Sequence, residues 1–165
     1  MHVTHTIEPV FDAHSRVLLL GTIPSPKSRE AGFYYGHPRN RFWPVMAALF
    51  DEPVPRTNEE RARLLLRHRI ALWDVLASCD IDGASDASIA QETPNDLRPL
   101  FAAAPISHVF CTGATAARLY RIYDEPVLGI AAVQLPSTSP ANAAFSFERL
   151  VTAYDVVKQC VEPDL

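Results

Sequence analysis

The chain has 165 residues, of which 48% are hydrophobic and 21% charged, values typical of a globular protein with one domain. A formal net charge of −4 argues against a general nucleic-acid coat protein and leaves room only for a local basic DNA site. The three cysteines are far apart and form no CxxC pair, which argues against a structural zinc site or an iron–sulfur cluster.

Targeting signals are not recognisable in this sequence. Residues 1–11 lack the basic and apolar regions of a signal peptide, and no apolar run approaches the roughly 20 residues that a membrane span needs. We therefore expect one domain over residues 1–165, located in the cytoplasm and not in a membrane.

The first predicted strand, residues 17–20, is the apolar run VLLL, which Gly21 closes. A long loop over residues 22–40 follows and leads to a predicted helix over residues 42–50, in which Pro44 falls in the first turn. In chain order we then predict a helix at 57–67, a strand at 70–73, a helix at 93–103, a strand at 108–111, a helix at 113–123, a strand at 130–135 and a helix at 146–161.

Strands that alternate with helices in this way predict an α/β fold, a three-layer α/β/α sandwich around a central four-stranded, mostly parallel sheet. Ligands of such sheets bind at the carboxyl ends of the strands. We therefore expect the loops at residues 21–40, 74–86, 112–113 and 136–143 to meet at one edge. Within the second of these loops, Asp82, Ser85 and Asp86 are predicted to be turn residues.

The segment at residues 21–43, GTIPSPKSREAGFYYGHPRNRFW, is the richest in functional side chains. Lys27, Arg29, Arg39 and Arg41 against Glu30 give it a net charge of +3, and aromatic residues are interleaved among them. Cations that neutralise phosphates and aromatic faces that stack on bases are typical of nucleic-acid binding. The alternative is that the aromatic side chains pack under the loop.

A second segment, LPSTSPAN at residues 135–142, places small hydroxyl residues directly after a predicted strand. Hydroxyl and backbone N–H groups at such a position can bind a phosphate. An ordinary Ser/Thr/Pro turn is the alternative interpretation.

These segments carry a resemblance to the uracil-DNA glycosylase superfamily. GTIPS, Tyr35 and HPRNRFW resemble its first signature, and LPSTSPANA resembles its second. The branch of hypoxanthine (deoxyinosine) DNA glycosylases is the most similar, through GTIPSPKS, YYGHPRNRFW, ALWDVLASC and LPSTSPANA. The resemblance implies an enzyme that hydrolyses the N-glycosidic bond of a deaminated base in DNA, most simply hypoxanthine, with no cofactor or metal and no obligate protein partner.

The chain departs from other branches of that superfamily at two catalytic positions. Ile23 stands where the mismatch-specific branch has a water-orienting Asn, and Leu135 stands where the classical uracil enzymes have a His. In the hypoxanthine branch the resemblance assigns the catalytic Asn to the HPRN stretch, which is Asn40 here. Asn40 also lies where a cap for the following helix belongs, and both roles are compatible.

The predicted site combines three groups of residues. The catalytic candidates are Asn40, to orient water or contact the base, His37, to protonate the purine or contact phosphate, and Asp74, to activate water or hold a loop. The base-binding candidates are Tyr35 as the stacking ring, with Thr22, Ile23, Thr112 and Gly113. The phosphate-binding candidates are Ser25, Lys27, Arg39, Ser137, Thr138 and Ser139.

Other functions stay open at this point. One alternative is a uracil or mismatch glycosylase with an unusual catalytic group, and another is a DNA-lesion binding protein without catalysis. A hydrolase of small nucleosides is disfavoured by the basic segment, and a Rossmann nucleotide site by the absence of GxGxxG.

Overall fold

The computed structural model describes residues 1–162 and is built around a four-stranded sheet in which every neighbouring pair is parallel. The strand order is β3 (Ile70–Asp74), β2 (Val17–Gly21), β6 (His108–Thr112) and β7 (Ala132–Leu135). This arrangement confirms the predicted α/β fold and its parallel central sheet.

Strand β2 explains why both faces of the sheet are covered. All of its residues are buried, as expected for the centre of a parallel sheet. Leu19 points into one core, whereas Leu18 and Leu20 point into the other, because successive strand side chains alternate between faces. Burial of each leucine contributes roughly 2 kcal/mol.

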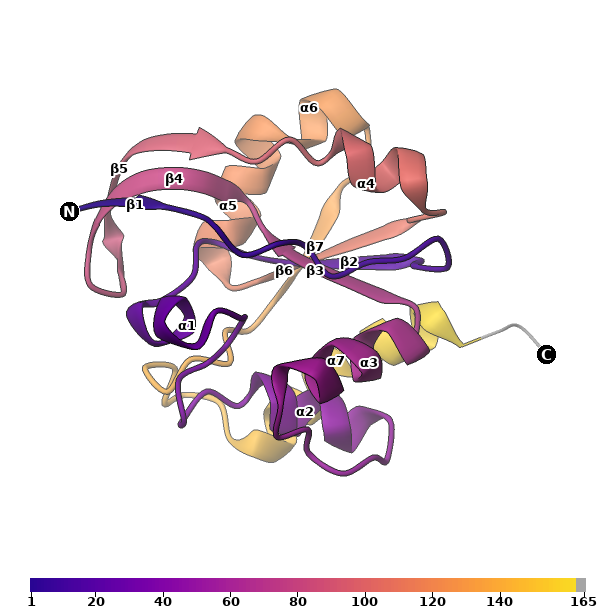
Figure 1. Cartoon of the computed structure of the whole chain (residues 1–165). Helices are drawn as coiled ribbons and strands as arrows, with labels where there is room; N and C mark the ends of the chain where they lie inside the picture. Colours follow the sequence, from indigo (N-terminus) through magenta and orange to yellow (C-terminus); the bar gives the residue numbers. More distant parts are fainter. Residues whose placement is uncertain (163–165) are drawn as a thin grey trace.

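Helices cover the two faces in separate layers (Figure 1). The layer drawn below the sheet contains α2 (Phe42–Leu49), α3 (Asn58–Arg67) and α7 (Phe147–Val161). The layer drawn above it contains α4 (Arg98–Ala103), α5 (Ala114–Tyr123) and α6 (Glu125–Leu128). The long loop after β2 contains one further helix, α1 (Pro26–Ala31). Within the described residues, no helix combines the length and apolar character needed to cross a membrane.

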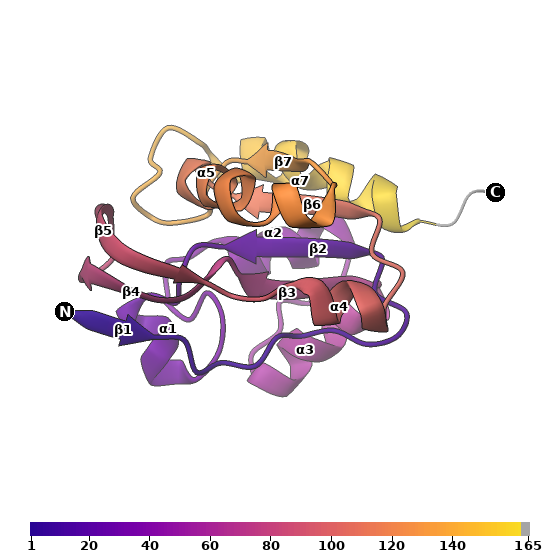
Figure 2. The ribbon, with the colours of Figure 1, turned by 90° about the horizontal axis from the view of Figure 1, so that it is seen from above.

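The structure corrects the prediction for residues 74–103. The expected loop is mostly an antiparallel hairpin of β4 (Leu76–Asp82) and β5 (Ser85–Pro94), and β1 (His2–Thr4) pairs with β4 to make a three-stranded sheet. Figure 2 shows these three strands together at the side where the chain begins. Thr93 and Pro94 therefore end a strand and do not begin a helix; the helix begins at Arg98, whose N–H donates to Asp96.

The hairpin turn follows from the dipeptide Asp82-Gly83. Gly83 has a φ of 57°, a left-handed conformation that glycine adopts without a steric penalty. Asp82, the last residue of β4, pairs with Ser85, the first residue of β5, across this turn. The prediction of a turn role was wrong for Asp86, which lies within β5 and in the wall of a cavity. The two loop residues are Gly83 and Ala84, and glycine at the first of two loop positions is typical of a hairpin turn.

Asp124, between α5 and α6, is a buried carboxyl group with only 5% exposure. No described residue donates a hydrogen bond to its Oδ2. Burial, with a smaller contribution from the charge of Asp96, raises the pKa of Asp124 from 3.8 to about 7. Between about pH 4 and pH 7, Asp124 therefore keeps its proton in the folded protein and releases it in the unfolded chain.

This difference predicts how stability changes with pH. Because the folded-state pKa lies above the unfolded value, the free energy of unfolding falls as the pH rises from about 4 to about 7. We expect Asp124→Asn to remove this slope and to raise the free energy of unfolding at pH 8 by about 1–3 kcal/mol. Urea unfolding of both proteins at pH 5 and pH 8 measures the effect. If the free energy of unfolding changed between these pH values by the same amount in Asp124→Asn as in the wild type, the prediction would be contradicted.

Candidate active site

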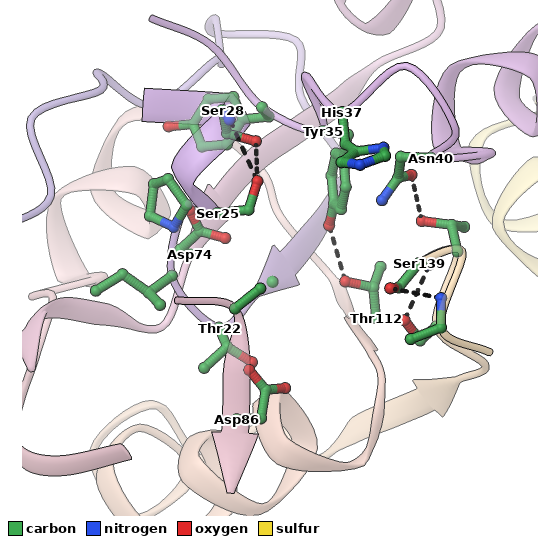
Figure 3. A pocket seen from close by; sticks show the side chains of 18 of the residues that line it. Thr22, Ser25, Ser28, Tyr35, His37, Asn40, Asp74, Asp86, Thr112 and Ser139 are labelled. Carbon is green, nitrogen blue, oxygen red and sulfur yellow. Dashed lines mark hydrogen bonds between the residues drawn. The ribbon is translucent and has the colours of Figure 1, made fainter. Parts of the chain in front are cut away.

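A cavity of about 360 Å³ opens at the carboxyl ends of the parallel strands, where the predicted loops meet. Its wall includes the hairpin residues Ile81, Gly83, Ala84 and Asp86, and it also includes Ser28 of α1. The predicted site residues in the wall are Thr22, Ile23, Ser25, Tyr35, His37, Asn40, Asp74, Thr112, Ser137, Thr138 and Ser139. Figure 3 shows their side chains converging from several loops.

Three predicted residues lie outside this wall. Lys27 and Arg39 are exposed on the surface, and the Nζ of Lys27 is 3.6 Å from the Oε2 of Glu30. Gly113 begins α5 with a φ of 109°, and its N–H donates to the carbonyl of Leu135 at 2.8 Å. The backbone of Gly113 therefore joins β7 to the start of α5, and this N–H is not free for a ligand.

Two of the four cations in the basic segment have structural partners. The guanidinium of Arg29 donates to the carbonyl oxygen of Pro24 at 2.8 Å. The guanidinium of Arg41 donates to three carbonyl oxygens of one loop, those of Ser139, Asn142 and Phe145. The charge available to DNA phosphates from this segment is therefore smaller than its composition indicates, and Lys27 and Arg39 are its exposed cations.

The side chain of Asn40 has a fixed orientation. Its Oδ1 accepts a hydrogen bond from the N–H of Phe42 at 2.9 Å and another from the hydroxyl of Thr138 at 2.8 Å. A backbone N–H can only donate, so this atom must be the amide oxygen. The amide nitrogen is left on the cavity side, as Figure 3 shows. Asn40 thus caps α2 through its oxygen and presents an N–H donor to the cavity.

Two predicted phosphate ligands use their hydroxyl groups within the protein. Thr138 is 1% exposed, and its hydroxyl proton is donated to Asn40. Ser25 caps α1: its Oγ accepts from the N–H of Ser28 and donates to the Oγ of Ser28. These contacts use both hydroxyl protons inside the protein, and the phosphate roles of the two residues stay predictions. The structure gives Thr138 a positioning contact with Asn40 and gives Ser25 a helix cap.

Ser137 and Ser139 keep hydroxyl donors. The Oγ of Ser137 accepts from the N–H of Ser139, and the Oγ of Ser139 accepts from the N–H of Ala141. Each hydroxyl proton is therefore directed elsewhere, and both residues line the cavity. His37 has a similar arrangement, because its Nδ1 accepts from the N–H of Arg39 at 3.0 Å. Neutral His37 then carries its proton on Nε2.

Tyr35 presents one ring face to the cavity. Its other face stacks on Phe42, with ring centroids 4.0 Å apart. Its hydroxyl is 2.8 Å from the hydroxyl of Thr112, which donates to the carbonyl of Leu20, so Tyr35 supplies the proton of the first bond. Burial and the charge of Asp74 raise the pKa of Tyr35, which keeps this proton in place. The φ of 52° is unusual for a tyrosine, a strain typical of functional sites.

The sequence analysis missed His5. Its Nε2 is 2.8 Å from the Oδ2 of Asp74, and both side chains are almost completely buried. A single histidine outside any motif offers no signal for such a pairing, since the two residues are 69 positions apart. Gly21 makes room for Asp74, because a Cβ at position 21 would lie 2.5 Å from the Oδ1 of Asp74.

A comparison with protein families decides what this arrangement belongs to. Residues 8–158 match the family model described as the uracil DNA glycosylase superfamily. The chain belongs to this superfamily. It is a DNA glycosylase, and its substrate is DNA.

Two similar proteins carry the same name. A hypoxanthine DNA glycosylase of Methanosarcina acetivorans is 34% identical over 144 residues, which cover 85% of this chain and 89% of the relative. A hypoxanthine DNA glycosylase of Methanosarcina barkeri is 35% identical over 98 residues, or 59% of this chain and 62% of the relative. These matches confirm the predicted family resemblance.

A solved structure supports the same assignment. The solution NMR structure of a protein from Methanosarcina acetivorans, described as a candidate uracil DNA glycosylase, superposes with a TM-score of 0.82 at 29% identity. The superposition covers 96% of this chain and 98% of that structure. The extra antiparallel sheet thus belongs to a fold that the two proteins share over nearly their whole lengths.

Two apolar residues, Ile23 and Leu135, occupy positions where other branches of the superfamily resemble this chain but have polar catalytic residues. Ile23 lines the cavity and packs against the core on the side of α5, and Leu135 is buried with 3% exposure. Neither side chain can donate or accept a hydrogen bond. Polar chemistry in the cavity must therefore come from other wall residues, which include the amide of Asn40 and the carboxyl groups of Asp74 and Asp86.

The contact between Thr138 and Asn40 gives a test of the site geometry. We expect Thr138→Val to lower the single-turnover excision rate about tenfold, because the amide of Asn40 loses one of its two fixed partners. Thr138→Ser keeps the hydroxyl and is expected to stay within about threefold of the wild type. Rates are measured with enzyme in excess, alongside thermal unfolding of each variant. Equal rates for the valine and serine variants would show that the contact does not position Asn40.

Proposed function

We propose that this DNA glycosylase excises hypoxanthine, the deaminated form of adenine, from deoxyinosine in DNA. The names of the two curated relatives support the choice of base. The observation that carries the proposal is the cavity-facing amide nitrogen of Asn40, held by two hydrogen bonds to its oxygen. We further propose that the enzyme acts in the cytoplasm without an obligate protein partner.

The target base must leave the duplex to reach the cavity. A glycosylase rotates the nucleotide out of the base stack, and a poorly paired deaminated base lowers the cost of this step. A volume of about 360 Å³ is in the range of small-ligand sites. The free face of Tyr35, supported from behind by Phe42, is the ring on which the base would stack. Such a stacking contact is worth about 1–3 kcal/mol.

Cleavage of the glycosidic bond places positive charge on the sugar and negative charge on the departing purine. The N–H group of Asn40 can donate to a purine nitrogen and stabilise the developing negative charge. It needs no reorganisation, because Phe42 and Thr138 already fix the amide. This arrangement favours stabilisation of the departing base over the orientation of water, since the amide oxygen already accepts two hydrogen bonds and is not free to accept one from water.

The DNA backbone would lie along the rim of the cavity. The hydroxyl groups of Ser137 and Ser139 and the Nε2–H of His37 are the proposed neutral donors to phosphate. The exposed cations Lys27 and Arg39 would add salt-dependent attraction at a greater distance. With its Nδ1 engaged by a backbone N–H, His37 is better suited to this role than to protonating the purine.

Two substitutions of Asn40 separate catalysis from helix capping. Asn40→Asp keeps an oxygen for Phe42 and Thr138 but replaces the N–H donor with a carboxylate oxygen. We expect a loss of deoxyinosine excision of at least about 100-fold with little change in stability. Asn40→Ala should lose similar activity and also about 1 kcal/mol of stability, because the cap is removed.

Duplexes with a single deoxyinosine, deoxyuridine or deoxyxanthosine, incubated in EDTA and then cleaved with alkali at abasic sites, measure this directly. Wild-type cleavage mainly at deoxyinosine supports the proposal. Cleavage mainly at deoxyuridine would assign the enzyme to uracil instead. Full deoxyinosine activity in Asn40→Asp would show that the amide is only a cap.

A further inference from the structure

The buried pair of His5 and Asp74 has a role beyond the excision step described above. We propose that the Oδ1 of Asp74 accepts a hydrogen bond from the ring N–H of the flipped base, and that His5 is the residue that positions it. This inference rests on the proposed function, which supplies the base. It makes Asp74 the residue that distinguishes a deaminated purine from adenine.

The protonation pattern of His5 can be read from its neighbours. Its Nδ1 accepts a hydrogen bond from the N–H of Ile7 at 3.2 Å, so the proton of the neutral ring lies on Nε2. That N–H then donates to the Oδ2 of Asp74 at 2.8 Å. The indole N–H of Trp73 donates to the carbonyl of Ile7 at 3.3 Å, and the hydroxyl of Tyr34 donates to the carbonyl of Glu8 at 2.7 Å, so both anchor the segment that carries His5. One oxygen of the carboxylate is thereby fixed.

The other oxygen of Asp74 faces the cavity. A Cβ at position 21 would lie 2.5 Å from Oδ1 and 3.1 Å from the hydroxyl of Tyr35, so glycine at this position leaves room for both groups. Asp74 is a cavity-wall residue, and within residues 1–162 no side chain or backbone N–H donates to Oδ1. A carboxylate oxygen in a cavity wall that has no internal donor is a strong acceptor for a ligand N–H.

The position of Asp74 favours the far edge of the base over the water that attacks the sugar. The side chain of Asp74 is only 6% exposed. In Figure 3 it lies across the cavity from Asn40 and Ser139, the side where we place the sugar and phosphate. The sugar stays joined to the DNA backbone outside, so a wall group this deeply buried meets the base edge farthest from the sugar. In a purine this edge carries N1.

Deamination changes the hydrogen-bonding character of N1. Adenine has a bare lone pair at N1, whereas hypoxanthine has an N1–H donor. A carboxylate can accept from that N–H, but it repels the lone pair of adenine. A site that hydrogen-bonds a substrate N–H rejects an analogue lacking it far more strongly than an apolar pocket does. Normal adenine, the abundant competitor in DNA, is thus excluded by charge.

A substrate and enzyme cycle tests this contact. Duplexes contain either deoxyinosine or N1-methyl-deoxyinosine, which has lost the N–H, and single-turnover rates are compared for wild type and Asp74→Ala. We expect the wild type to cleave the methylated base at least about 100-fold more slowly. Asp74→Ala should lose a similar factor on deoxyinosine but change less than about threefold on the methylated base. Equal loss on both substrates would overturn the inference and assign Asp74 to water activation.

The role of His5 has its own variants. His5→Leu removes the donor to Asp74 and should reduce the preference for deoxyinosine over the methylated base about tenfold. His5→Gln retains an N–H donor and is expected to keep most of that preference, which a purely structural role would not explain. His2→Leu is the matched control, because His2 pairs with Asp80 at 2.9 Å on the same segment but at the surface. Thermal unfolding confirms that each variant is folded.

The outcomes separate this inference from the proposed function. Deoxyinosine cleavage with an unchanged preference in Asp74→Ala and His5→Leu would overturn the inference alone. If the wild type cleaved only deoxyuridine, the proposed base would be wrong. The same cycle with N3-methyl-deoxyuridine would then decide the role of Asp74, because uracil carries its ring N–H at N3.

Discussion

The site depends on the hydrogen bonds that converge on the amide oxygen of Asn40. Phe42 donates from the start of α2, and Thr138 donates from the loop after β7, 98 positions away in the chain. Beside them, the N–H of Arg41 donates to the carbonyl of Thr138, and its guanidinium binds further carbonyl groups of that loop. The two loops, each of which carries one of the two family signatures, are thereby held together as one wall of the cavity. Such preorganisation is what electrostatic catalysis requires, because the protein does not need to rearrange during the reaction.

The cavity has a donor side and an acceptor side. Asn40 contributes an amide N–H from one wall, and Asp74 contributes a carboxylate oxygen from the other. On our proposals these groups serve different purposes: the donor stabilises the departing purine, and the acceptor selects the base. Tyr35 lies between them, with its hydroxyl fixed by Thr112 and its back supported by Phe42. A base stacked on this ring would therefore meet polar groups only at its edges.

The sequence was sufficient for the parallel sheet, because its central strands β2 and β6 contain continuous apolar runs that only a doubly covered sheet can bury. It was insufficient for the hairpin, since β5 is largely exposed and its pairing with β4 contains register shifts that interrupt simple alternation. Asn40 could be found because it lies within a recognisable motif. The internal hydrogen bonds of the Ser25 and Thr138 hydroxyl groups could not be predicted, because composition does not show where a hydroxyl proton points.

The N-terminal strand has a practical consequence for work with this enzyme. β1 pairs with β4 of the antiparallel sheet, and the segment directly after it holds His5 against Asp74, a residue of the cavity wall. The first residues thus support a wall residue of the cavity from behind. On our proposal for His5 and Asp74, a truncation of this segment would change substrate choice, so comparisons between preparations require the same N-terminus. A tag at the opposite end of the chain leaves this segment untouched.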